Sequence, residues 1–424
     1  MLPPGPREPA ALQTVEWIAR PTAFLRRCRA RHGEPFTVRV AWADAPMVLV
    51  SDPEAIRRVF AADPAVLHGG ASSTVLEPFA GPTSILLTHG PEHLRRRREL
   101  LPAFHGDALA GGRETIAAMA AAEVAAWPAG ATLRTLPRMQ ALTLDVILRV
   151  VFGPGKRPEL RAAIRRALDM TASLPRLVAM SLHRGATWNR FVRAVGEVDG
   201  LLAREIDRGG HPAGSLLGAL AAADVGRQEL RDQVVTVLAA GHETTAGSLA
   251  WALERLAHHP AVQARVRDGD DAYLGAVVKE VLRVRPVLSI AARRVAAPFE
   301  VGGHLLPPGV HVAPCIYLAH RRPQAWPDPT SFRPERFLEG APERGTYLPF
   351  GGGERRCAGA AFAALELREV LRAVLGRFAL APAGAGTERM RRGSVTLRPS
   401  RGGTVVPEPL QPTRLCRSSA ATTA

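Results

Sequence analysis

Apolar residues recur every three or four positions over much of the chain between residues 92 and 285. This spacing puts apolar side chains on one face of a helix and predicts helices over 113–127, 138–152, 158–172 and 188–208. The longest predicted helix runs from Arg227 to His259 and is ended by Pro260. It is apolar on most faces, so we expect it to lie in the middle of the protein.

On either side of this helical region the pattern changes. Asp52 followed by Pro53 predicts a capped helix start. Residues 68–90 are rich in Gly, Ser, Thr and Pro and predict a long loop, of a length that is usually functional inside a compact domain. The remaining predictions are two short strands in 36–50, short strands and turns in 293–315, irregular chain in 320–350, a helix over 359–378, and strands at 394–398 and 403–406.

No internal repeat and no linker divides the chain. We therefore expect a mainly α protein with small β-sheets, built as one domain. The predicted boundaries are a proline-rich leader at 1–9, a single domain at 10–406 and a disordered tail at 407–424.

The composition excludes several classes of protein. The chain has 424 residues and 46% hydrophobic residues, which excludes a collagenous, disordered or polytopic membrane chain. Its net charge of +16 indicates either an anionic partner or a bias toward Arg, since Lys156 and Lys279 are its only lysines. Aromatic residues make up 5% and no nucleic-acid-binding signature is present, so we expect no nucleic-acid partner.

Cysteine usage and the terminal sequence bear on the compartment. Four scattered cysteines, Cys28, Cys315, Cys357 and Cys416, do not form a disulfide framework. The N-terminus has no apolar signal region, and no uncharged apolar run reaches the roughly 18 residues of a membrane span. We expect a cytoplasmic protein without a membrane anchor.

The strongest chemical signal is the segment from Phe350 to Gly359, in which Cys357 follows a run of glycines at the start of a helix. Glycines let the backbone approach a bulky flat group, and N–H groups at a helix start stabilise a thiolate. A lone Cys cannot close a zinc site, but it can be the axial ligand of heme iron. The alternative for an isolated Cys is a free buried thiol, as we interpret Cys315.

With Gly353 and Arg355, this segment reads Phe-x-x-Gly-x-Arg-x-Cys-x-Gly and resembles the heme-binding signature of the cytochrome P-450 family. Two further segments resemble that family: the Glu-x-x-Arg of Glu280 and Arg283, and the Pro-Glu-Arg-Phe that contains Arg336. The resemblance implies a cytochrome P-450 fold, with heme between the long I helix and the L helix that follows Cys357. It also implies a buried structural network of Glu280, Arg283 and Arg336.

The centre of the longest predicted helix, Ala240-Gly241-His242-Glu243-Thr244-Thr245, resembles the oxygen-activation motif of this family. A Gly followed by Thr loosens the helical ladder, because the hydroxyl competes for a backbone carbonyl. A neighbouring acid can relay protons. The predicted catalytic residues are Glu243 and Thr244. His242 fills the variable position and faces the heme, the substrate or neither.

Further cofactor contacts follow from the resemblance. His93 and Arg97 match the family's His-x-x-x-Arg, whose members pair with heme propionates. Arg293, chosen over Arg294 by its spacing to Gly302, joins them. The full predicted heme-binding set is His93, Arg97, Ala240, Gly241, Arg293, Phe350, Gly351, Arg355, Cys357 and Gly359, with Cys357 as the metal ligand.

The resemblance implies a heme-thiolate monooxygenase that holds heme b (iron protoporphyrin IX) and inserts one oxygen atom of O2 into an apolar substrate by hydroxylation or epoxidation. The chain carries no flavin or iron–sulfur domain, so electrons are expected from an NAD(P)H-driven ferredoxin and its reductase, or from a flavodoxin-type donor. We expect an acidic donor to dock on a basic face of Arg95, Arg96, Arg98, Arg356 and Arg368.

Three alternatives remain open at this point. A peroxygenase or isomerase on the same fold tends to lack the acid–alcohol pair, whereas a non-catalytic heme sensor can dispense with it. A basic nucleic-acid-binding protein would hold no heme. The predicted substrate pocket draws on the 68–90 loop, Leu238, Ala239, Ser248, residues 287–292 and a turn near 390–395. Its apolar side chains suit a fatty acid, terpenoid, steroid or polyketide and do not choose among them.

Overall fold

The computed structural model describes residues 1–410 except 42, 71–75, 172–184 and 394. Parts of the expected loop, of the strand at 394–398, of the helix at 158–172 and of the C-terminal tail therefore lie outside the described residues. Strand β12 (Thr404–Pro409) runs beyond the expected domain boundary at residue 406.

The described chain is mainly helical, as its pattern predicts. The helices are α1 (Ala10–Ala19), α2 (Pro21–His32), α3 (Pro53–Ala61), α4 (Glu77–Ala80), α5 (Gly90–Leu100), α6 (Gly106–Ala125), α7 (Thr135–Phe152), α8 (Pro158–Thr171), α10 (Gly185–Arg208), α11 (Leu216–Ala222), α12 (Arg227–Ala257), α13 (Pro260–Arg267), α14 (Asp271–Val284), α15 (Ile316–Ala319) and α16 (Ala360–Leu375). Short 3₁₀ turns lie at Leu101–Phe104, Pro334–Phe337 and Gly353–Arg355.

The strands form four small sheets. The largest has the order β1 (Phe36–Val38), β2 (Met47–Val50), β8 (His311–Pro314), β5 (Arg293–Val295) and β3 (Leu67–His68), and only its β2–β8 pair is parallel. The others join β4 (Leu133–Arg134), β12 and β9 (Phe378–Pro382), then β6 (Phe299–Val301) and β7 (His304–Leu306), and finally β10 (Met390–Arg392) and β11 (Leu397–Pro399).

Local sequence explains several boundaries. The Asp52 side chain accepts hydrogen bonds from the backbone N–H groups of Glu54 and Ala55, so α3 begins at Pro53 as predicted. The expected long loop at 68–90 is interrupted by α4 and by the end of β3. The strand expected at 394–398 is β11, and its partner β10 was not expected, because a three-residue strand gives almost no periodic signal.

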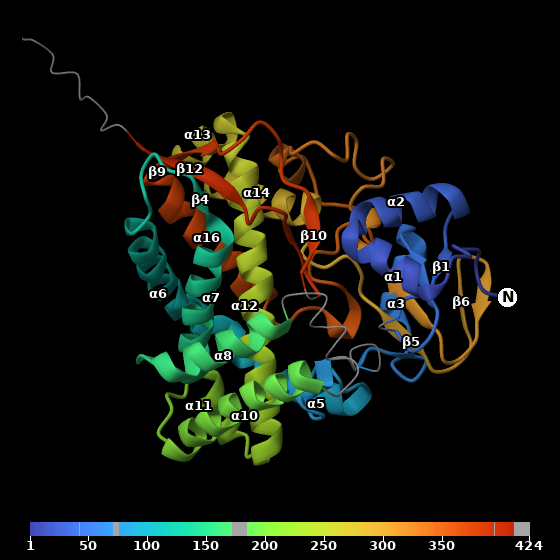
Figure 1. The fold of residues 1–424 in the computed structure, drawn as a ribbon, viewed down its shortest axis with the longest axis horizontal. Coiled ribbons are helices and arrows are strands. Elements are labelled where there is room, and N and C mark those ends of the chain that lie inside the picture. Colours follow the sequence, from blue (N-terminus) through green and yellow to red (C-terminus); the bar gives the residue numbers. More distant parts are fainter. Residues whose placement is uncertain (42, 71–75, 172–184, 394, 411–424) are drawn as a thin grey trace, which may run out of the picture.

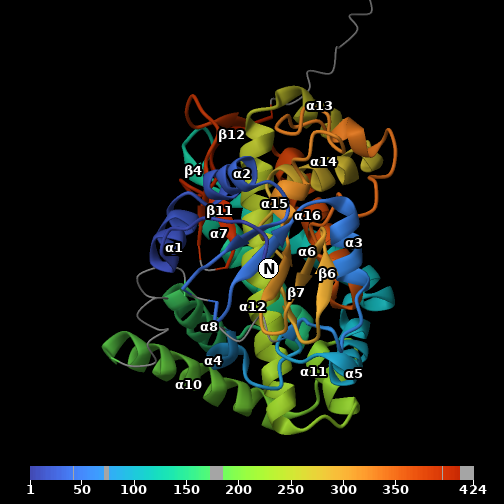
Figure 2. The same ribbon diagram turned by 90° about the vertical axis from the view of Figure 1, so that its right-hand side faces the viewer.

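Helix α12 runs through the middle of the molecule, as predicted for a helix that is apolar on most faces. Figure 1 shows it passing between the helices α6 to α8 and the sheet region that carries the N-terminus, and Figure 2 shows it running behind that region. It packs along α7 and also against α16, the helix that begins three residues after Cys357. The chain that follows Cys357 is therefore packed against α12, the helix that carries residues 240–245.

Within the described ranges, no helix combines the length and the hydropathy needed to cross a membrane.

Candidate functional site

The loop around Cys357 is closed by its own backbone. The N–H of Cys357 donates to the carbonyl of Phe350 at 3.0 Å, which brings the first and last parts of the motif together. Gly351 and Gly353 adopt positive φ, where a side chain would strain the backbone. A Cβ on Gly352 would also come within 2.4 Å of the Phe60 ring of α3. The turn therefore requires glycine at positions 351 and 353, and packing against Phe60 requires it at position 352. These requirements hold whether or not a cofactor approaches the loop.

The Cys357 thiol is accessible at its surface yet sits among enough protein atoms to change its acidity. Burial raises its pKa, while the N–H of Gly359 and the charges of Arg97 and Arg356 act in the opposite direction and do not overcome it. The N–H of Gly359 thus favours the thiolate, as expected from the sequence, but burial still keeps the pKa of the thiol above its ordinary value. A metal ion bound to the sulfur would remove the proton outright.

Four of the predicted cofactor ligands, His93, Arg97, Arg293 and Arg355, form a second group. The Nδ1 atom of His93 lies 3.1 Å from both the carbonyl of Ile85 and Nη1 of Arg355. Arg355 also donates to the carbonyls of Ile85 and Leu86 at 3.1 and 2.9 Å. Arg355 is thereby held against the chain that precedes α5.

Arg97 and Arg293 complete this cluster. Arg97 donates to the carbonyl of Arg356 at 2.6 Å, and Arg293 to the carbonyl of Ala292 at 2.9 Å. Burial and the charges of Arg293 and Arg97 lower the pKa of Arg355 to about 10, and burial with the charge of Arg355 lowers that of His93 to about 4. Burial is the larger cause in both residues, and the charge of Glu354 opposes it at Arg355. A bound anion would further stabilise the charged form of this guanidinium group.

The residues present fit a heme with its two carboxylates. In the part of the chain that the structure describes, Arg97, Arg293 and Arg355 form no ion pair, and the buried Nε2 of His93 has no hydrogen-bond partner. No group of three His, Cys, Asp or Glu side chains among these residues could hold a metal ion by itself. A single sulfur ligand near a cluster of unpaired guanidinium groups suits a metal that arrives inside an anionic macrocycle.

The predicted oxygen-activation motif occupies an unbroken stretch of α12. The Thr244 hydroxyl donates to the carbonyl of Ala240 at 2.6 Å, the competition for a backbone carbonyl that the sequence suggested. Ala240 is exposed although most of the helix around it is buried. A face of α12 is thus open at the level of the motif.

The other motif residues point toward α7. Gln140 donates from Nε2 to Oε2 of Glu243 at 2.8 Å. Thr143 lies 3.0 Å from Nδ1 of His242 and donates to its carbonyl. Burial raises the pKa of Glu243, opposed by the Gln140 bond and the charge of Arg398, and lowers that of His242 to about 4. His242 is therefore a neutral interior group against α7.

The third predicted cluster, Glu280, Arg283 and Arg336, is brought together in the interior. Arg283 is fully buried and donates to both carboxylate oxygens of Glu280 at 2.7 Å. It also reaches the carbonyls of His320, Pro329 and Ser331, while Arg336 reaches Glu280 at 3.3 Å. These bonds fasten the irregular segment 320–336 to α14, which is a structural role.

The expected docking face must be corrected. Arg95 is paired with Glu99 and Glu229, and Arg96 is 3% exposed and paired with Glu92 and Glu229. Arg368 is paired with Asp271. These three guanidinium groups already have carboxylates close by, a fact that one-dimensional charge patterns cannot reveal. Arg98 and Arg356 are exposed and form no ion pair within the described residues.

Sequence reasoning missed Gln140, Thr143 and Ile147 of α7, and Phe60 of α3. A Cβ on Gly241 would come within 2.9 Å of Ile147, so that glycine faces α7. The only signal in the sequence was that Gln140 and Thr143 are polar residues spaced i, i+3 in a largely apolar helix. Such a pair is equally typical of the solvent-exposed face of a helix.

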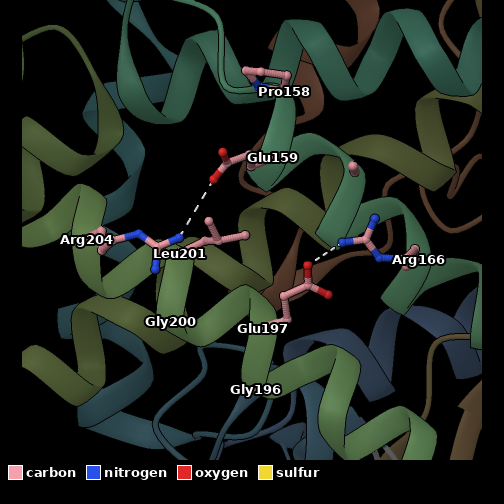
Figure 3. Close-up of a pocket in the computed structure, with 9 residues that line it drawn as sticks. Pro158, Glu159, Arg166, Gly196, Glu197, Gly200, Leu201 and Arg204 are labelled. Carbon is pink, nitrogen blue, oxygen red and sulfur yellow. Dashed lines mark hydrogen bonds and ion pairs between the residues drawn. The ribbon is translucent and has the colours of Figure 1, made fainter.

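A surface groove lies away from these clusters. Its volume is about 590 Å³, and it runs between α8 and α10. Figure 3 shows that the ion pairs Arg166–Glu197 and Arg204–Glu159 span it. Gly196 and Gly200 are among its lining residues, and none of the predicted site residues lines it.

The chain is similar in sequence to one known protein family and to individual members of it. The family model described as Cytochrome P450 matches residues 3–406. A Mycobacterium tuberculosis protein named cytochrome P450 135B1 is 40% identical over 430 residues, which cover 95% of this chain and 91% of that protein. Cytochrome P450 135A1 of the same organism is 40% identical over 402 residues, which cover 90% of each chain.

Solved structures agree at the level of the fold. CYP175A1 from Thermus thermophilus matches with a TM-score of 0.76 and 30% identity, covering 92% of this chain and 95% of that one. The retinoic acid-bound cyanobacterial CYP120A1 has a TM-score of 0.84 and 23% identity, covering 97% of this chain and 100% of that one.

Proposed function

The chain belongs to the cytochrome P450 family, and on that premise we propose that it is a monooxygenase that uses heme b to insert one atom of O2 into an apolar organic substrate. The observation that carries this proposal is the accessible Cys357 sulfur near a cluster of guanidinium groups that form no ion pair among the described residues. The heme would supply the cleavage of dioxygen, favoured by a thiolate ligand.

The residues of this chain have separate tasks in the proposal. Cys357 holds the iron, while His93, Arg97, Arg293 and Arg355 hold the propionates. Phe350, Gly351 and Gly359 in the Cys loop, and Ala240 and Gly241 on α12, would contact the heme. The propionates would provide carboxylates for a cluster in which burial, and then the charges of Arg293 and Arg97, lower the pKa of Arg355.

Proton delivery is assigned to Glu243 and Thr244. The pKa of Glu243 is raised by burial, which brings this carboxyl closer to the pH at which it can both hold and release a proton. Thr244 carries its hydroxyl at the level of the exposed Ala240 and can exchange its bond to the helix carbonyl for one to a water or to substrate oxygen.

Electrons come from an external donor in this proposal, a ferredoxin with an NAD(P)H-dependent reductase or a flavodoxin-type protein. Arg98 and Arg356 are the exposed cations left for an acidic donor after the correction above. They lie on adjoining segments, because Arg97 of α5 donates to the carbonyl of Arg356. We keep the cytoplasm as the predicted compartment.

The proposal is tested by the difference spectrum of the dithionite-reduced protein with and without carbon monoxide. We expect the strongly red-shifted Soret band of a thiolate–iron–carbonyl complex in the wild type and its loss in Cys357→Ala. Cys315→Ala is the matched control, since this cysteine is buried and its pKa is raised to about 12 by burial. A band typical of histidine-ligated heme, or no heme at all, contradicts the proposal.

A further inference from the structure

The α7 residues that face the oxygen-activation motif form a regular stripe. Gln140, Thr143 and Ile147 are spaced i, i+3 and i+7, so they lie along one face of the helix. They contact three successive residues of α12: Gln140 bonds Glu243, Thr143 bonds His242, and Ile147 packs over Gly241. The motif is thus held from the side of α7 at each of these positions.

Glu243 and Thr244 are consecutive residues of a helix, so their side chains leave the axis about 100° apart. The Thr244 hydroxyl is bonded to its own helix at Ala240, and the Glu243 carboxyl is bonded to Gln140. No hydrogen bond joins the two side chains in the described part of the chain. The orientation of the acid is therefore determined by a neighbouring helix and not by its alcohol partner.

Within the described residues, Gln140 is the one side chain that hydrogen bonds the Glu243 carboxyl. Two charged groups act on it through space: Arg398 of β11 favours the carboxylate and Asp169 of α8 opposes it. Asp169 is 65% exposed, so its effect is partly screened by solvent. The amide of Gln140 donates to the carboxylate and stabilises its charged form directly.

We propose that Gln140 is a positioning residue that holds the Glu243 carboxyl against α7 in the resting protein and sets how readily it takes up a proton. This inference rests on the proposed function, in which Glu243 moves protons. It assigns a role to a residue outside the oxygen-activation motif. The hydrogen bond from Gln140 to Glu243 must be broken or lengthened each time the carboxyl turns toward Thr244.

The test is a pH titration of the Glu243 carboxyl in the ferric holoprotein by infrared spectroscopy. The carbonyl stretch of the protonated acid is identified by its absence from Glu243→Gln. Gln140→Leu removes a hydrogen bond to a charged group, so we expect the pKa of Glu243 to rise by about one unit. Gln140→Glu keeps the size of the side chain and places a second carboxyl there, so it should raise this pKa further.

Thr143→Val is the matched control, since Thr143 lies on the same stripe but bonds His242. We expect it to leave the Glu243 titration unchanged. The pH profile of substrate oxidation in Gln140→Leu should move by the same amount and in the same direction as the infrared titration.

Three outcomes overturn the inference: an unmoved Glu243 titration in both Gln140 variants, an equal movement in Thr143→Val, and a moved titration with an unmoved pH profile. The infrared measurement follows the carboxyl and not the turnover. A protein without the thiolate–carbonyl band would therefore refute the proposed function separately.

Discussion

The Cβ position of Gly241 lies 2.9 Å from Cδ1 of Ile147, closer than side chains pack in folded proteins. The two residues belong to α12 and α7, which pack along each other for much of their length. A glycine in the middle of a helix costs about 1 kcal/mol relative to alanine. Here the missing side chain lets α7 come close enough for Gln140 and Thr143 to reach the motif.

Replacing Gly241 with alanine should therefore give little or no gain in stability. The helical gain of about 1 kcal/mol opposes an overpacking cost of about 1–3 kcal/mol. In an Ile147→Ala background the obstacle is gone, and the same change should raise the free energy of unfolding. Urea unfolding of the four proteins measures the coupling between the two sites.

Gly275→Ala in α14 is the control for this cycle, because nothing lies within 4 Å of its added Cβ. We expect a gain of about 1 kcal/mol there. Equal effects of Gly241→Ala with and without Ile147 would contradict the packing explanation.

The case of Gly241 shows what the sequence could and could not predict. Helix α12, its central place and the motif on it follow from a long apolar pattern and a specific run of residues. The Cys loop, likewise, is local in sequence. The partner of each motif side chain was not predictable, because Gln140 and Glu243 are 103 residues apart and nothing in the pattern of α7 pairs them.

The same limit explains the error about the docking face. Arg95 and Arg96 read as a run of free basic residues, yet their partner Glu229 comes from α12. By contrast, Glu280 and Arg283 are one helical turn apart, so their pairing is local and was expected. The sequence predicted contacts within an element well, and contacts between elements only where the family resemblance supplied them.

Arg283→Met should strongly destabilise the protein. It leaves the Glu280 carboxylate buried without its main partner and removes three bonds to the 320–331 segment. Breaking a buried pair on one side costs about 3–5 kcal/mol. Arg283→Lys should recover little, since an ammonium group cannot reproduce the planar set of donors. Urea unfolding measures both.

Arg333→Met is the matched change at the surface, where Arg333 is 47% exposed and paired with Glu339. Its loss should change the free energy of unfolding by less than about 1 kcal/mol. Equal losses in the free energy of unfolding for Arg283→Met and Arg333→Met would show that the buried network contributes no more to stability than a surface ion pair.

Glu366→Gln should stabilise the protein at neutral and alkaline pH. Glu366 is buried in α16, its Oε1 atom has no hydrogen-bond partner among the described residues, and burial raises its pKa to about 8. Between its ordinary pKa near 4.5 and 8, the folded state binds more protons than the unfolded state, so stability falls as the pH rises through this window. Glutamine removes this loss, on the order of 3 kcal/mol at pH 7.

The gain from Glu366→Gln should vanish as the pH approaches 4.5, which unfolding curves across the window would detect. Glu369→Gln, one turn further along α16, should have the opposite sign, because Glu369 is paired with Arg113 and Arg372. If Glu366→Gln raised the free energy of unfolding by the same amount at all pH values, the cause would be packing and not the protonation of Glu366.

Arg98→Glu should slow reduction by an acidic donor protein and reduce the dependence of that rate on salt. Arg98 is exposed, and its side chain reaches only the carbonyl of Leu94 on its own helix among the described residues, so its charge is available to a partner. Steering by such rim charges acts mainly on the association rate and weakens as ionic strength rises. Stopped-flow reduction at several salt concentrations measures it.

The comparison with Arg95→Gln decides whether this effect belongs to a docking surface or to the total charge of the protein. Arg95 is paired with Glu99 and Glu229, so its loss removes one of the two arginines that join α5 to Glu229 of α12 and does not remove an unpaired charge. We therefore expect lower stability with an almost unchanged salt dependence of reduction. The two variants could instead change the salt dependence of reduction equally per unit of charge removed. That result would mean that the net charge of +16 steers the donor, and that no local docking surface is involved.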